Sequence, residues 1–97
     1  MSKYEIKYSA AFKKKSIKAF RHDKPTLAEI ERIIDKLAND ETLEQKHKDH
    51  ALSGSLAGFR ECHIRPDLFL IYEKQDDLLI LTAINIGSHS KLFKSLR

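Results

Sequence analysis

The sequence has little of the residue types that mark several large classes of protein. Its 97 residues include one cysteine, so no disulfide can form within the chain. No apolar run approaches the ~20 residues needed to cross a bilayer, and the first residues lack the apolar core of a signal peptide. There is no internal repeat, low-complexity segment or linker. These absences favour a single cytoplasmic domain over residues 1–97, with no membrane partner.

Positive charge is the main compositional signal. Eighteen Lys and Arg face fourteen Asp and Glu, which gives a net charge of +4 and a pI near 9.2. In a small protein this balance indicates an anionic partner, either a nucleic acid or an acidic protein. The lysine run at residues 13–15 fits a solvated helix face, and it also fits a surface that follows a phosphate backbone.

The first forty residues show the patterns of one strand and two helices. Residues 4–8 alternate as in a short strand, and Ser9 is expected to cap a helix over residues 10–20. Residues 21–25 break that helix. A second helix is expected to start at Thr26, because the apolar residues from Leu27 to Leu37 follow a 3.6-residue period. Two helices joined by a short polar turn predict an antiparallel hairpin packed on a sheet.

The remaining residues show the pattern of a β-meander. Residues 40–50 carry no period and are expected to form a loop. Strands are predicted over residues 59–64, 68–72 and 78–84, with turns at 65–67 and 75–77. Ser88 or Ser90 is expected to cap a brief C-terminal helix through residue 96. The order β-α-α-β-β-β-α predicts an α+β fold, an antiparallel sheet with the helical hairpin on one face.

Residue types suited to catalysis lie at the strand ends of this meander. His50 precedes a strand, His63 lies near the end of one, Asp67 opens the next, and His89 follows the last. Neighbouring antiparallel strands begin and end at the same edge of a sheet. We therefore expect His63 and Asp67 to be close, with His89 joining them if the last strand returns to that edge.

The alternation of residues along the strand at 59–64 predicts which side chains share a face. Glu61 and His63 belong to one face, and Arg60, Cys62 and Ile64 belong to the other. If Cys62 and Ile64 face the helices, Glu61 and His63 point to the open face. Cys62 is expected to be a small buried residue rather than a nucleophile.

Metal-free RNA cleavage needs the residue types found here. A base removes the proton of the 2′-hydroxyl, an acid protonates the departing 5′-oxygen, and a cation steadies the phosphorane. Histidine can act as acid or base near neutral pH, and an aromatic ring such as Phe93 can stack on an unpaired base. Taken singly, each of these residues also has an ordinary structural explanation, and His22 and His47 are expected to be surface residues.

Three motifs resemble the YafQ branch of the RelE toxin superfamily. They are DHALSG at residues 49–54, GFRECHIRPD at 58–67 followed by an apolar strand, and GSHSKLF at 87–93. The resemblance implies a RelE-like fold and a ribosome-dependent endoribonuclease that cuts mRNA in the A site without a metal or cofactor. It implies His50, His63, Asp67 and His89 as the acid–base set.

The resemblance also implies binding partners and a substrate surface. The substrate-binding residues would be Arg60, Glu61, Arg65, Lys91 and Phe93. A cognate antitoxin would cover the basic surface, and operator DNA would be bound only through the toxin–antitoxin complex.

Three positions depart from the family pattern, and they keep other functions open. Ala51 stands in place of a Pro, Leu68 in place of a Trp, and Asn85 in place of an Arg that would hold the phosphate. Arg60, Arg65 or Lys91 would have to substitute for that Arg. One alternative is a non-catalytic toxin that binds only its antitoxin and operator DNA. Another is a gyrase inhibitor of the ParE type, which the histidines disfavour.

Overall fold

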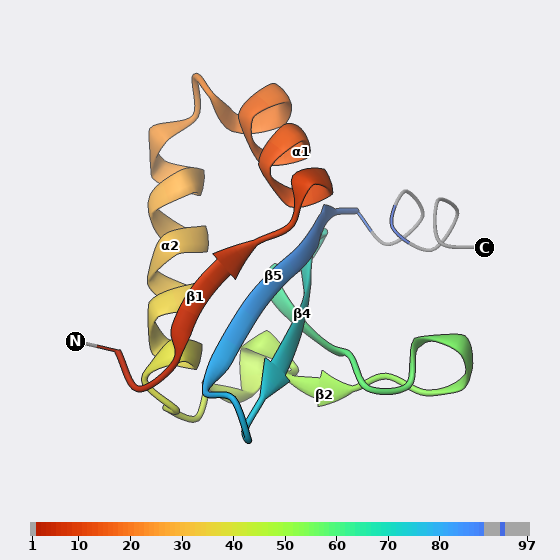
Figure 1. The fold of residues 1–97 in the computed structure, drawn as a ribbon. Helices are drawn as coiled ribbons and strands as arrows, with labels where there is room; N and C mark the ends of the chain where they lie inside the picture. Colours follow the sequence, from red (N-terminus) through yellow and green to blue (C-terminus); the bar gives the residue numbers. More distant parts are fainter. Residues whose placement is uncertain (1, 89–91, 93–97) are drawn as a thin grey trace.

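The described part of the chain is a mixed five-stranded sheet with two α-helices on one face (Figure 1). The structure is a computed structural model that describes residues 2–88 and Leu92. The predicted C-terminal helix therefore lies outside the described residues, apart from Leu92. Among the described residues, no helix combines the length and apolar character that crossing a membrane requires. The α+β fold class is confirmed.

Capping side chains fix the starts of both helices. Helix α1 spans Ala10–Phe20, and the Ser9 hydroxyl accepts a hydrogen bond from the Phe12 N–H at 3.0 Å, as predicted. Helix α2 spans Lys24–Ala38, so the predicted start at Thr26 was two residues late. Asp23 is the true cap, accepting from the Thr26 N–H and hydroxyl. Pro25 fits the first turn because that turn needs no backbone donor there.

Five strands lie in the order β1-β5-β4-β3-β2. Their bounds are Glu5–Tyr8 for β1, His50–Ala51 for β2, Arg60–Arg65 for β3, Leu68–Gln75 for β4 and Ile80–Gly87 for β5, and the short 3-10 helices η1 and η2 span Gln45–His47 and Gly54–Leu56. The β2–β3–β4–β5 pairs are antiparallel, whereas β1 runs parallel to β5. The expectation of a wholly antiparallel sheet is corrected at this one pair.

The predicted strand boundaries differ from the observed ones by up to three residues, and two further differences have a clear physical reason. Strand β2, inside and just beyond the predicted loop, is too short to show a period. The predicted strand at residues 78–84 begins two residues later, because Leu78 and Leu79 form the β4–β5 turn. Leu79 has a φ of 53°, in the left-handed region, and both leucines are exposed. Their hydrophobicity had suggested a strand.

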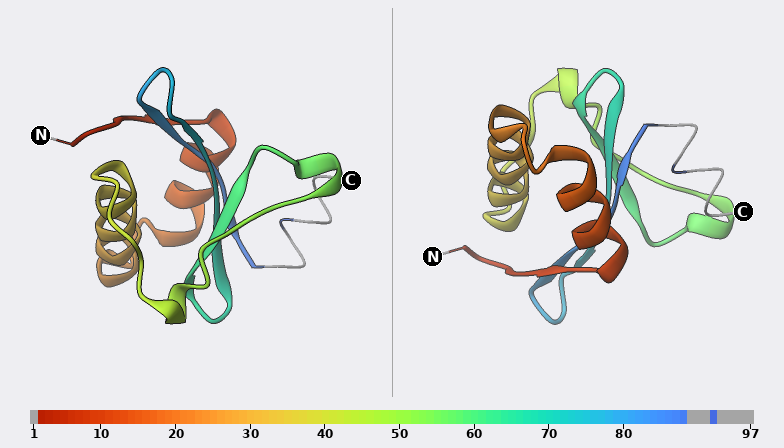
Figure 2. Two further views of the ribbon diagram at one scale, coloured as in Figure 1. Left: turned by 90° about the horizontal axis from the view of Figure 1, so that it is seen from below. Right: turned by 90° about the horizontal axis from the view of Figure 1, so that it is seen from above.

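The two faces of the sheet carry different amounts of apolar packing. The larger core joins the helices to the sheet through residues such as Ile33, Leu37, Cys62, Ile64 and Leu70. A smaller cluster on the other face contains Phe69, Ile71 and Leu92, with Leu52, Phe59 and Ile84 packed against it. The segment around η2 projects on this second side, away from the helices (Figure 2). We call this second side the open face.

Candidate active site

Strand pairing aligns the candidate residues in two rows across the open face. Paired residues on neighbouring strands point to the same side of a sheet. The first row runs His50–Glu61–Ile71–Asn85 over β2, β3, β4 and β5. The second row runs His63–Phe69–Gly87 over β3, β4 and β5. Cys62 and Ile64 belong to the helix-side core, so the predicted alternation along β3 is confirmed.

Glu61 lies between two imidazoles. Its Oε1 is 3.4 Å from His50 Nε2 and 3.9 Å from His63 Nε2, and the two rings meet edge to face with centroids 6.4 Å apart. The residue is 4% exposed, and its Oε2 has no hydrogen-bond partner among the described residues. A buried carboxylate beside two histidines can orient them and stabilise a proton on either. We call His50, Glu61 and His63 the Glu61 cluster.

His50 presents one exchangeable nitrogen to this carboxylate. Its Nδ1 is 2.5 Å from the Lys48 carbonyl oxygen, and a carbonyl only accepts, so Nδ1 carries a hydrogen and donates it. Nε2, on the Glu61 side, is therefore the atom that can gain or lose a proton. The side chain is 47% exposed, so a substrate can reach it.

His63 is held more tightly. Its ring stacks on Phe69 with centroids 4.1 Å apart and an interplanar angle of 13°. Its carbonyl accepts a hydrogen bond at 2.7 Å from Nδ1 of His47, which is 4% exposed. The prediction that His47 is a surface residue was wrong, because η1 packs this ring against β3. No sequence period covers residues 45–47, so only the fold could reveal this contact.

Asp67 is grouped with different side chains. It is exposed in the β3–β4 turn, where its charge raises the pKa of Arg65 as a lesser cause after the hydrogen bond from Arg65 to Glu29. It also lines a cavity with Lys15 and Lys18 of α1. The structure brings His50 and His63 together at Glu61, and a catalytic role for Asp67 stays a prediction.

Both predicted arginines point to the helix side of the sheet. Arg65 donates to the Glu29 carboxylate on α2 at 2.6 Å. Arg60 pairs with Tyr72 of the helix-side core and donates to its hydroxyl at 3.1 Å. Strand alternation turns Arg60 to this face, and the β-bulge after His63 turns Arg65 there as well. A substrate-binding role for either arginine stays a prediction.

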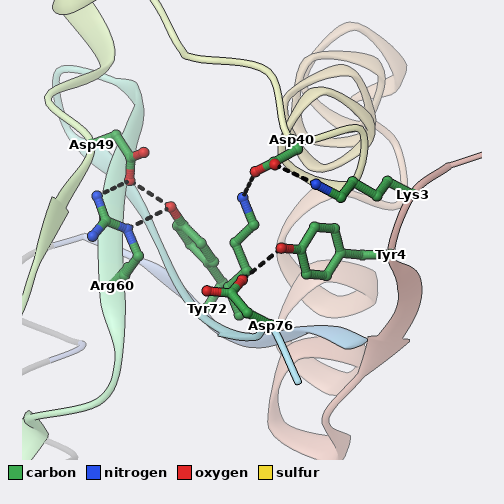
Figure 3. A network of polar contacts seen from close by, with 8 residues as sticks. Lys3, Tyr4, Asp40, Asp49, Arg60, Tyr72 and Asp76 are labelled. Carbon is green, nitrogen blue, oxygen red and sulfur yellow. Dashed lines mark hydrogen bonds and ion pairs between the residues drawn. The ribbon is translucent and has the colours of Figure 1, made fainter. Parts of the chain in front are cut away.

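Asp49, Arg60 and Tyr72 form a polar triad behind the Glu61 cluster (Figure 3). The Tyr72 hydroxyl donates to Asp49 Oδ1 at 2.5 Å, and Arg60 Nη2 lies 3.4 Å from the same oxygen. Burial, followed by the bond to Asp49, raises the pKa of Tyr72 far above its usual range. Asp49 and Arg60 directly precede His50 and Glu61, so the triad fixes β2 against β3. Sequence reasoning did not identify it.

A second polar group in the same view ties the N-terminus to the sheet (Figure 3). Asp40 accepts from Lys3 at 2.9 Å and also from Lys74 of β4. These hydrogen bonds, Lys3 first, lower the pKa of Asp40 to about 2. The Tyr4 hydroxyl donates to Asp76 at 2.5 Å, which raises the pKa of Tyr4 to about 12.

Three predicted residues, His89, Lys91 and Phe93, lie outside the described residues. Asn85, in the first row, is 5% exposed, and its Oδ1 accepts from the Ile86 N–H at 3.0 Å. Within residues 2–88 and Leu92, no group of three or more His, Cys, Asp or Glu side chains is arranged to hold a metal ion. Metal-free chemistry stays a prediction.

Comparisons with known proteins agree with this architecture over nearly the whole chain. The family model described as "Bacterial toxin of type II toxin-antitoxin system, YafQ" matches residues 4–94. The protein named mRNA interferase toxin YafQ from Escherichia coli K12 is 32% identical over 94 residues, which cover 96% of this chain and 99% of the relative.

Solved structures give the same result. A metal-bound toxin from Helicobacter pylori is 37% identical with a TM-score of 0.82, covering 93% of this chain and 99% of that one. YafQ in the E. coli DinJ–YafQ toxin–antitoxin complex is 30% identical with a TM-score of 0.79, covering 94% and 98%. From the match of the family model and the full-length relatives, this chain belongs to the YafQ family of type II toxin–antitoxin toxins.

Proposed function

We propose that this toxin is a ribosome-dependent endoribonuclease that cuts mRNA in the A site by metal-free acid–base catalysis. The observation that carries the proposal is the Glu61 cluster, where two imidazoles share one buried carboxylate oxygen on the open face. The name mRNA interferase of the E. coli relative supports the substrate class. The basic charge of the chain supports an RNA partner.

The chemistry uses two proton transfers. One group of the cluster takes the proton of the 2′-hydroxyl as that oxygen attacks the adjacent phosphorus. A second group gives a proton to the departing 5′-oxygen, which leaves a 2′,3′-cyclic phosphate and a 5′-hydroxyl. In this proposal Nε2 of His50 and the ring of His63 exchange these protons, and Glu61 orients both rings. His89 and Asp67 complete the proposed acid–base set, with Lys91 and Phe93 on the substrate surface.

A cognate antitoxin is the second proposed partner, with operator DNA bound through the complex. The complex of E. coli YafQ with DinJ supports it. An acidic segment of such a protein would complement the positive charge of this chain and cover its basic surface.

One observation favours a second candidate, a toxin that binds its antitoxin without cutting RNA. Asn85 stands in the first row, where the resemblance places an Arg, while Arg60 and Arg65 bond on the helix side. The two rows, as described, contain no Lys or Arg that could steady the phosphorane. If the missing charge limits catalysis, Asn85→Arg should raise the cleavage rate.

Primer extension on an mRNA translated in vitro separates the two candidates. Wild-type toxin should produce cleavage ends at A-site codons only when ribosomes are present, and His63→Ala should lower the rate by about 10²–10⁴-fold. Glu61→Gln should also lower it, because a neutral amide cannot stabilise an imidazolium. His22→Ala, at an exposed histidine between the helices, is the matched control and should cut normally.

Two outcomes would contradict the proposal. Absence of cleavage ends from folded wild-type toxin would favour the binding-only candidate. Loss of cleavage by toxin that was stripped with EDTA and desalted before it was added to Mg²⁺-containing ribosomes, restored by a transition metal, would contradict metal-free catalysis. The metal-bound H. pylori relative is the reason for this control.

A further inference from the structure

The cavity that Asp67 lines lies at the end of the sheet, beside the C-terminal half of α1. It encloses about 630 Å³ between α1, the start of α2, the β3–β4 turn and the end of β5. The side chains that matter here are Lys15, Lys18, Phe20, Arg65, Leu68 and Ile86. We call it the α1–β5 cavity; Figure 1 shows α1 beside the end of β5.

The rim of the cavity carries two lysines, Lys15 and Lys18, whose charges are available to a ligand. Lys15 and Lys18 are three residues apart, so they project from one side of α1. Neither has an ion-pair partner among the described residues, whereas Arg65 is bonded to Glu29. Asp23, which also lines the cavity, is used in capping α2, so Asp67 is the remaining carboxylate.

This charge is part of a strong asymmetry along the chain. The first 24 residues hold eight Lys and Arg and two Asp and Glu, a net charge of +6, and the other 73 have a net charge of −2. Residues 9–22 contain no acidic side chain at all. The field around α1 therefore attracts an anion.

The floor of the cavity is apolar. Leu68 is 8% exposed and Ile86 is 1% exposed, and the half-buried ring of Phe20 packs beside them. A ligand that carries a flat apolar ring and an anionic group a short distance away matches both parts. A nucleotide has this chemistry, because its base can stack on a ring while its phosphate pairs with lysine.

The cavity lies at the same end of the sheet as the second row, but on the helix side, because Leu68 and Ile86 belong to the helix-side core. Gly87 lines the cavity and pairs with Phe69, which pairs with His63 in the second row. Leu68 lines it and pairs with Arg65, just beyond the β-bulge that follows His63. Along the strand direction the cavity and the His63 row are one or two residues, ~3–7 Å, apart, and the sheet lies between them. An RNA strand lying on the open face would reach the cavity by passing over the exposed β3–β4 turn.

We propose that the α1–β5 cavity binds one nucleotide of single-stranded RNA, where the strand continues past the Glu61 cluster and over the β3–β4 turn. The base lies on Phe20, Leu68 and Ile86, and the phosphate contacts Lys15 and Lys18. This inference rests on the proposed function for the identity of the RNA as substrate. It gives the toxin a cationic contact with that RNA, which the described residues of the two rows on the open face lack.

The test is an NMR titration of ¹⁵N-labelled toxin with a 2′-O-methyl RNA trinucleotide. The methyl group blocks attack by the 2′-oxygen, so binding is measured whether or not the toxin cuts RNA. Amide signals of Ala19, Gly87 and Ser88 should shift. The Lys15→Gln/Lys18→Gln variant should bind at least about tenfold more weakly, since each lysine loses a charged contact.

Two matched controls lie on the same helix. Lys13→Gln/Lys14→Gln makes the same charge change at exposed positions outside the cavity and should weaken binding about twofold at most. Ala19→Trp fills the cavity from its exposed rim and should prevent binding, whereas Ala11→Trp, also exposed on α1, should not. A trinucleotide with abasic sites should bind more weakly than the intact one.

Several results would overturn the inference. Equal weakening by both lysine pairs would mean general attraction to α1 and no site. Normal binding by Ala19→Trp would mean that the cavity is not used. Unchanged RNA affinity combined with lost antitoxin affinity in the Lys15→Gln/Lys18→Gln variant would assign the cavity to an acidic protein segment. If the toxin binds the trinucleotide but does not cut unmodified mRNA, the proposed function fails and this inference stands.

Discussion

Replacing Tyr72 by Phe removes one oxygen atom from the centre of the triad. The residue is 1% exposed, and its hydroxyl donates to Asp49 and accepts from Arg60. A hydrogen bond to a charged group contributes about 1.5–3 kcal/mol, but Asp49 and Arg60 can still pair with each other and reach water. We therefore expect Tyr72→Phe to cost about 2 kcal/mol, which lowers the melting temperature of a domain this size by about 8–16 °C.

The same change should also affect activity. Without the hydroxyl, Asp49 loses its hydrogen bond to Tyr72 of β4. Strand β2, which carries His50, is then held less firmly against β3. Cleavage by fully folded Tyr72→Phe should be slower than by wild type. Tyr4→Phe is the matched control, since that buried phenol bonds only to Asp76 among the described residues, far along the chain from β2.

Urea unfolding followed by circular dichroism gives the stability, and primer extension gives the activity. The reasoning fails if the free energy of unfolding of Tyr72→Phe is within about 0.5 kcal/mol of the wild-type value. A change that small is typical of a neutral substitution on the surface. It also fails if Tyr4→Phe slows cleavage as much as Tyr72→Phe does, because the triad would then have no special connection to His50.

Three further outcomes follow from the described contacts. The pKa of Asp40 is lowered to about 2, so its contribution to stability is present above pH ~4 and is lost as the pH falls to 2. In Asp40→Asn, the free energy of unfolding in urea should therefore change less between about pH 4 and pH 2 than in wild type. Cys62 is fully buried, and burial raises its thiol pKa, so a thiol reagent should modify it only at the rate of unfolding. Ile33→Ala should cost about 2–5 kcal/mol in thermal unfolding, whereas Ile17→Ala, at an exposed position of α1, should stay within about 0.5 kcal/mol.

Local patterns in the sequence were enough to predict the helices and the faces of β3. Ile30, Ile33, Ile34 and Leu37 repeat with the helical period, and all four are buried. The alternation around Cys62 correctly assigned Glu61 and His63 to the open face, because a strand in a half-covered sheet has only two faces.

Features that depend on contacts between distant segments were not predictable. No local pattern shows that β1 runs parallel to a strand 75 residues later, or that His50 and Ala51 pair with β3. The burial of His47 depends on the path of η1 across β3. The direction of Arg60 depends on Asp49 and Tyr72, which are 11 and 12 residues away in sequence.

The position of β5 between β1 and β4 has a consequence for synthesis of the toxin. The first strand made by the ribosome can pair only with the last, so β1 has no partner in the described sheet until residue 80 and those after it have emerged. Contacts this distant in sequence form slowly, because the chain between them must be closed first. A product of interrupted translation would therefore leave β1 and the edge of β4 unpaired, and a cell would be exposed only to toxin chains that had been completed.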